Sequence, residues 1–120
     1  MTLAGWSGSR SVRALFWASA IFSFVMAVLP HPPMIPGNPS DKLQHIAAFV
    51  TMSALGAWAY PRFKLLRLLA LLSAFGAAIE VFQAIPALHR DSDVWDWVGD
   101  TAAVSVVLLA VWLRRRRASA

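Results

Sequence analysis

The residues whose types could do chemistry lie inside stretches that are otherwise apolar. Glu80 and Gln83 stand three residues apart in one apolar run, and His45 stands near the start of another. Asp96 and Asp100 stand four residues apart at the start of a third. An ionisable group in the middle of a bilayer costs at least about 2.5 kcal/mol, and such groups commonly mark functional sites. We therefore treat these residues as the candidate site and the remaining chain as its scaffold.

The spacing of these residues predicts that they share helix faces. Asp41 and His45 are four apart, and side chains three or four apart are neighbours on a helix surface. Glu80 stands about five residues from the end of its run, which places it roughly 8 Å inside. The candidate catalytic residues are His45, Glu80 and Asp96, and the candidate binding residues are Asp41, Lys42, Gln83 and Arg90.

The composition indicates that the scaffold lies in a membrane. Of 120 residues, 58% are hydrophobic and only 14% are charged, which is too little polar surface for a soluble domain of this length. The absence of cysteine excludes disulfides, thiolate zinc sites and a cysteine nucleophile. A net charge of +5 does not indicate nucleic acid, because the basic residues stand at the ends of the apolar runs.

Four apolar runs approach the roughly 20 residues that a membrane-spanning helix needs. They predict an all-α fold, a four-transmembrane-helix up-and-down bundle that forms a single domain over residues 1–120. The expected spans are 11–29, 42–60, 65–85 and 94–113. The first run also resembles a signal peptide, but its cleavage site is poor, so we expect it to be retained.

Charge predicts the orientation of these spans. Positive charge favours the cytoplasmic side, so both termini are expected inside (N-in/C-in) and the candidate site at the outer face. The basic residues on the predicted inner side are Arg10, Arg13, Arg62, Lys64, Arg67 and Arg114–Arg117. The acids on or toward the outer side are Asp41, Glu80, Asp91, Asp93, Asp96 and Asp100, joined by Lys42 and Arg90.

At these polar residues the chain resembles the VanZ-like family of small integral membrane proteins, from about Asp41 to Ala103. The matching pattern is Asp41-Lys42-x-x-His45, then Glu80-x-x-Gln83, then Arg90 followed six residues later by Asp96. Family members often have asparagine where this chain has Asp100. The family is named for an association with resistance to teicoplanin, a lipid-bearing glycopeptide. The resemblance implies a multi-pass protein of the bacterial cell membrane, associated with the envelope.

We expect the site to bind or modify an envelope lipid or an amphiphile such as a lipoglycopeptide. As an enzyme, it would use His45 or Glu80 as general base, while Lys42 and Arg90 would hold an anionic group. Whether the protein is an enzyme stays open at this point, and its cofactor is unknown. A metal-dependent enzyme would use His45, Glu80 and Asp96 as ligands. No recognised metal-spacing motif is present, however, so no metal ligand is assigned.

Three other functions remain open. A non-catalytic binder would only hold the headgroup, and an accessory protein would use the polar residues to fix helix packing. An ion- or proton-linked carrier would relay protons through the carboxylates, although the polar residues stop halfway along the spans. The expected partners are membrane lipids and a lipid-linked or glycopeptide ligand, with no nucleic acid. The oligomeric state is left open.

Overall fold

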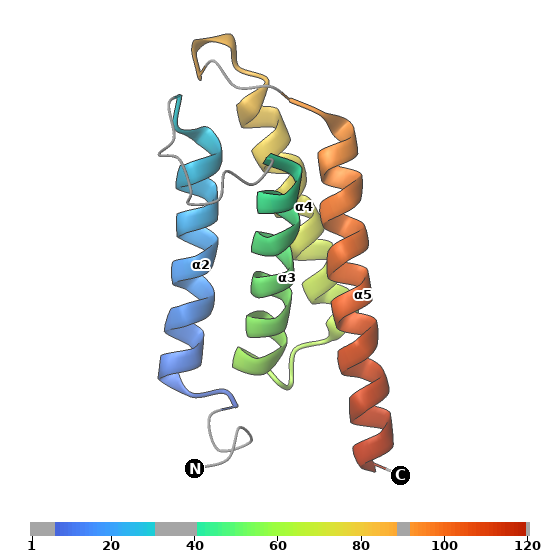
Figure 1. Cartoon of the computed structure of the whole chain (residues 1–120). Coiled ribbons are helices and arrows are strands. Elements are labelled where there is room, and N and C mark those ends of the chain that lie inside the picture. Colours follow the sequence, from blue (N-terminus) through green and yellow to red (C-terminus); the bar gives the residue numbers. More distant parts are fainter. Residues whose placement is uncertain (1–6, 31–40, 89–91, 120) are drawn as a thin grey trace.

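The computed structural model describes residues 7–30, 41–88 and 92–119, which form an all-α four-helix bundle. Consecutive helices run in opposite directions, so the start of α2, the connection after α3 and the end of α5 lie at one end (Figure 1). The elements are α2 (Arg10–Val28), α3 (Asp41–Ala59), α4 (Leu65–Gln83), the short 3-10 helix η1 (Pro86–Leu88) and α5 (Val94–Ser119).

The helix bounds confirm the four expected helices, with one extension. α2, α3 and α4 each begin and end within two residues of the predicted spans, whereas α5 continues six residues past Leu113 to Ser119. The run Arg114–Arg117 therefore ends the apolar stretch without ending the helix, because arginine is a good helix former. At the other end of α5, Asp93 Oδ1 accepts a 2.9 Å hydrogen bond from the backbone of Trp95.

In the part of the chain that the structure describes, three helices are long and apolar enough to cross a membrane, namely α2, α4 and α5. Large apolar side chains also face outward, including Leu66 (80% exposed) and Phe22 (64% exposed). These observations indicate a multi-pass membrane protein. α3 is as long as α2 and α4, with 19 residues each, but its first turns carry Lys42, Gln44 and His45.

The core explains how α3 can be less apolar than its neighbours. α3 packs against both α2 and α5, and Figure 1 shows it between these two helices. Phe49 and Met52 on α3 are 1% and 0% exposed, and they join Val12, Ile79 and Val104 in the buried core. α3 therefore contacts protein over much of its surface, so its polar groups need not face lipid.

Two glycines let the helices approach closely. A Cβ atom added to Gly56 would lie 3.0 Å from Cε1 of Phe16 and 3.2 Å from Cδ1 of Leu68. A Cβ atom on Gly76 would lie 3.3 Å from a ring atom of Phe49 and from one of Trp97. Small residues at such contacts are typical of helix packing in membranes.

Replacing Gly56 by alanine is expected to cost about 1–3 kcal/mol of unfolding free energy relative to Gly99→Ala, because the rings and methyl groups around Gly56 must move. Gly99 is the matched control, since a Cβ there would have no atom within 4 Å among the described residues. The measurement is unfolding of both variants in the same detergent, followed by circular dichroism. Equal stability of the two variants would contradict the close packing at Gly56.

Candidate functional site

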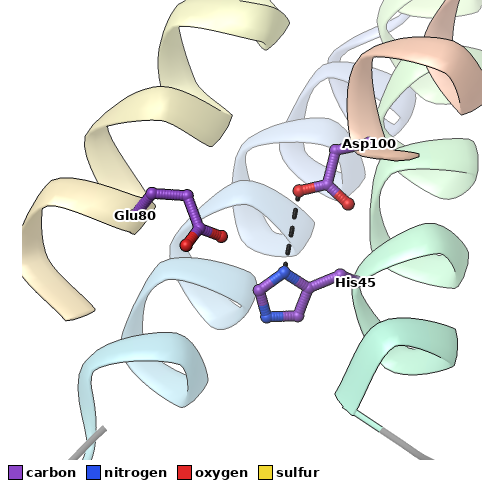
Figure 2. A group of neighbouring side chains, drawn as sticks. All are labelled: His45, Glu80 and Asp100. Atoms are coloured by element: carbon purple, nitrogen blue, oxygen red, sulfur yellow. Dashed lines mark ion pairs between the residues drawn. The ribbon is translucent and has the colours of Figure 1, made fainter. Parts of the chain in front are cut away.

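Three ionisable side chains from three helices converge near the end of the bundle opposite the arginine run. Figure 2 shows His45 of α3, Glu80 of α4 and Asp100 of α5 pointing toward one another. Each offers one nitrogen or oxygen atom, and these atoms all lie within 4.8 Å of one another. The alternating helix directions bring the start of α3, the end of α4 and the start of α5 together (Figure 1). We call His45, Glu80 and Asp100 the buried cluster.

His45 and Asp100 form the closest pair in the buried cluster. Nδ1 of His45 lies 3.6 Å from Oδ2 of Asp100, and the two side chains are 12% and 2% exposed. This separation exceeds the roughly 2.7–3.2 Å of a hydrogen bond, so the contact is an ion pair when the imidazole is protonated. Neither oxygen of Asp100 has a hydrogen-bond partner among the described residues.

Glu80 connects the end of α4 to the start of α5. Its Oε2 accepts a 2.9 Å hydrogen bond from the backbone N–H of Asp93 and lies 3.2 Å from the hydroxyl of Ser92. The same hydroxyl lies 3.0 Å from the backbone carbonyl of Glu80. The other carboxylate oxygen, Oε1, is buried and has no hydrogen-bond partner in the described parts of the chain. One oxygen of Glu80 is thus used structurally and the other remains in the buried cluster.

Gln83 does not join the buried cluster. It is 2% exposed, and its Nε2 donates a 3.0 Å hydrogen bond to the carbonyl of Ala27 in the last turn of α2. The last carbonyls of a helix have no partner within the helix, so Gln83 satisfies one of them. The structure therefore gives Gln83 a role in joining α4 to α2.

Asp96 and Lys42 lie near the buried cluster without entering it. Asp96 is one turn closer to the start of α5 than Asp100, and its side chain has no hydrogen bond or ion pair with any residue that the structure describes. Lys42 is exposed in the first turn of α3. The side chain of Asp41 and the whole of Arg90 lie outside the described residues.

Asp100 is the cluster residue that the sequence did not identify as a candidate catalytic or binding residue. The signal was present, because Asp100 follows Asp96 by one helical turn and shares its face. Depth decides between the two carboxylates. His45 lies four residues inside the start of α3, and Asp100 lies six residues inside the start of α5, whereas Asp96 lies only two. Residues at similar depth in neighbouring helices meet, so Asp100 faces His45.

The buried cluster offers an imidazole nitrogen and carboxylate oxygens to a single point. Such donors can hold a divalent cation, accept a proton, or bind an amine or hydroxyl group of a ligand. Within the buried cluster, the atoms with no hydrogen-bond partner among the described residues are His45 Nδ1, Glu80 Oε1 and both oxygens of Asp100. Buried polar atoms without partners are uncommon in folded proteins and call for an explanation.

Fold and site together define a four-helix bundle with three candidate transmembrane helices and a buried His-Glu-Asp cluster near one end, which indicates a multi-pass membrane protein. Comparison of the chain with models of known families, with curated proteins and with solved structures found no match.

Proposed function

We propose that this chain is a VanZ-like protein of the bacterial cytoplasmic membrane that binds or modifies the polar group of an envelope lipid or amphiphile. The buried cluster would face the outside, and its ligand would be a lipid-linked sugar, a lipoglycopeptide or a related molecule. One observation carries the proposal: three ionisable side chains from three helices converge below the surface with four polar atoms unsatisfied. Fixing four helices does not require such costly groups.

The proposed orientation rests on the distribution of basic residues. In this arrangement α3 crosses the membrane as well as α2, α4 and α5. Both ends of the chain are cytoplasmic, and the buried cluster lies toward the outer leaflet. The start of α2, the connection between α3 and α4, and the end of α5 lie at the same end of the bundle (Figure 1). The basic residues of these segments are Arg10, Arg13, Arg62, Lys64, Arg67 and Arg114–Arg117.

An apolar groove beside the first turns of α3 supports an amphiphilic ligand. The groove lies between α2 and α3 and has a volume of about 580 Å³. Its volume is within the range of about 300–1,000 Å³ that is typical of small-molecule sites. An acyl chain in this groove would place a headgroup near the helix end that carries the buried cluster. The groove is lined by residues that include Ser19, Phe22, Leu43, Ala47, Ala48 and Thr51.

Lipid identification tests the proposal. The full chain and its Glu80→Gln variant are purified side by side in mild detergent, and bound lipids are identified by mass spectrometry. A binder should carry a specific headgroup-bearing lipid that the variant loses. An enzyme should instead accumulate its substrate when Glu80 cannot act as a base. Asp93→Asn is the matched control, because it removes a nearby carboxylate but keeps the backbone N–H that Glu80 accepts from.

A structural role is the second candidate, and specific contacts favour it. Glu80 bonds to Ser92 and Asp93, and Gln83 bonds to Ala27, so both tie helices together. Under this alternative, Glu80→Gln should lower the unfolding free energy while the bound lipids stay the same. The same lipid profile in wild type, Glu80→Gln and Asp93→Asn would therefore contradict ligand binding.

An ion- or proton-linked carrier is the third candidate, and the core gives it little support. Below the buried cluster, the described core residues are mainly apolar and include Phe49, Met52, Leu72 and Leu108. The only buried polar group there among the described residues is Ser53, whose hydroxyl bonds to the carbonyls of its own helix. A relay across the membrane requires further ionisable or hydrated groups along its path.

A further inference from the structure

We propose that His45, Glu80 and Asp100 bind one divalent transition-metal ion of the zinc class. The ligands would be Nδ1 of His45, Oε1 of Glu80 and a carboxylate oxygen of Asp100. This inference goes beyond the proposed function, because it concerns what the buried cluster holds whatever the organic ligand is. It also differs from the metal set considered from the sequence, in which Asp96 stood in the place of Asp100.

The donor types select the class of metal. Imidazole nitrogen suits zinc and its neighbours in the first transition row, and carboxylate oxygen is compatible with them. One histidine and two carboxylates give three protein ligands. Zinc sites with three protein ligands leave the fourth position to water or substrate. The buried cluster would therefore hold a metal with an open position.

The distances fit a shared metal better than a hydrogen bond. Two atoms bound to one tetrahedral zinc ion at about 2.1 Å are separated by about 3.4 Å. Nδ1 of His45 and Oδ2 of Asp100 are 3.6 Å apart, which exceeds the range of about 2.7–3.2 Å for a hydrogen bond. One nitrogen or oxygen atom from each of the three side chains lies within 4.8 Å of the other two, so the carboxylate of Glu80 is close enough to share the same ion after a side-chain movement.

Burial and charge supply a second, independent reason. Asp100 is 1% exposed and Glu80 is 8% exposed, and three of their four carboxylate oxygens have no hydrogen-bond partner in the described chain. Among the described residues, no lysine or arginine lies within 4 Å of either carboxylate. An isolated carboxylate in an apolar interior is strongly disfavoured. A divalent ion with a neutral imidazole would balance both negative charges.

Neighbouring groups already hold one ligand in place. Oε2 of Glu80 is bonded to the backbone N–H of Asp93 and lies within hydrogen-bond distance of Ser92, whereas Oε1 is buried and has no hydrogen-bond partner among the described residues. In metal sites, such outer contacts orient a ligand, and their loss typically weakens metal binding about 10–100-fold. We therefore expect Ser92→Ala to weaken binding without removing a ligand.

Cobalt titration tests the metal site directly. The full chain is purified in detergent, stripped with a chelator and titrated with Co²⁺, whose visible absorption reports ligand binding, and Zn²⁺ is then added as competitor. Wild type should bind one Co²⁺ per chain and release it to Zn²⁺. Asp100→Asn and His45→Gln should each bind Co²⁺ more than about 100-fold more weakly, since losing a metal ligand lowers the affinity more than losing an outer contact does. Asp96→Asn, the same change one turn away, should bind like wild type.

Two results would overturn the metal site. One is a wild-type protein that takes up no Co²⁺ and carries no metal by elemental analysis. The other is equal affinity of wild type and Asp100→Asn. Circular dichroism of each variant shows whether it is folded, and Ser92→Ala locates the site if both ligand variants fail to fold. The titration needs no lipid, so its outcome is separate from that of lipid identification.

Discussion

Asp100→Asn is expected to raise the unfolding free energy of the metal-free protein by about 1–3 kcal/mol while it removes binding at the buried cluster. Asp100 is 1% exposed and its oxygens have no hydrogen-bond donor among the described residues. The amide has almost the same shape but no charge, so the cost of burying a carboxylate disappears, and no ion pair is lost when the imidazole of His45 is neutral. The measurement is unfolding in detergent with chelator present, followed by circular dichroism.

Asp96→Asn serves as control, because Asp96 is only half-buried and lies on the same helix. Its unfolding free energy should change by less than about 0.5 kcal/mol. A less stable Asp100→Asn protein would show that Asp100 stabilises the bundle, which would favour the structural role. A more stable variant that cannot bind would show that stability is lost for function at this position.

Glu80→Ala is expected to lower the unfolding free energy by about 2–3 kcal/mol, because hydrogen bonds to a charged acceptor contribute about 1.5–3 kcal/mol each and the cost of burying the carboxylate offsets part of their sum. The variant loses the acceptor for the backbone N–H of Asp93 and for the hydroxyl of Ser92. The connection between α4 and α5 should also open more often. Unfolding in detergent and limited proteolysis of residues 84–93 measure the two effects.

Two further variants separate this contact from other effects of truncation on α4. Glu80→Gln keeps one acceptor oxygen, so it should lose clearly less stability than Glu80→Ala. Val81→Ala is the matched control, since Val81 is the next residue and is 69% exposed. If Glu80→Ala were as stable as Val81→Ala, the contact with Ser92 and Asp93 would contribute nothing measurable to the fold.

The helices were predictable because their apolar runs are long and bounded by proline, polar residues or arginine. α2, α3 and α4 were therefore placed within two residues at each end. The end of α5 was not, since the pattern marks where the apolar stretch stops and the backbone hydrogen bonds continue through Arg114–Arg117 to Ser119. The structure shows three helices apolar enough to span a membrane, so the crossing of α3 stays a prediction.

The sequence predicted the chemistry of the site and the end of the bundle at which it lies. It did not predict which residues form the site. The spacing placed His45 and Glu80 near each other, and the structure brings them together. It did not show that Asp100 replaces Asp96, since that choice depends on the depth and rotation of α5 against α3. It also did not show that Gln83 reaches α2. Glu80 and Gln83 share one face of α4, but that face borders two neighbouring helices, and Gln83 bonds to α2 while Glu80 points into the buried cluster.

The arginine run of α5 has a consequence for how deeply the buried cluster sits. Arg114 follows Asp100 by fourteen positions, which corresponds to about 21 Å along the helix. If Arg114 is anchored at one interface of a hydrocarbon core about 30 Å thick, Asp100 lies about 9 Å below the other interface. Membrane thickness then sets the hydration of the site. A thinner bilayer brings Asp100 toward water, and a thicker one isolates it, so lipid chain length becomes a control on access to the cluster.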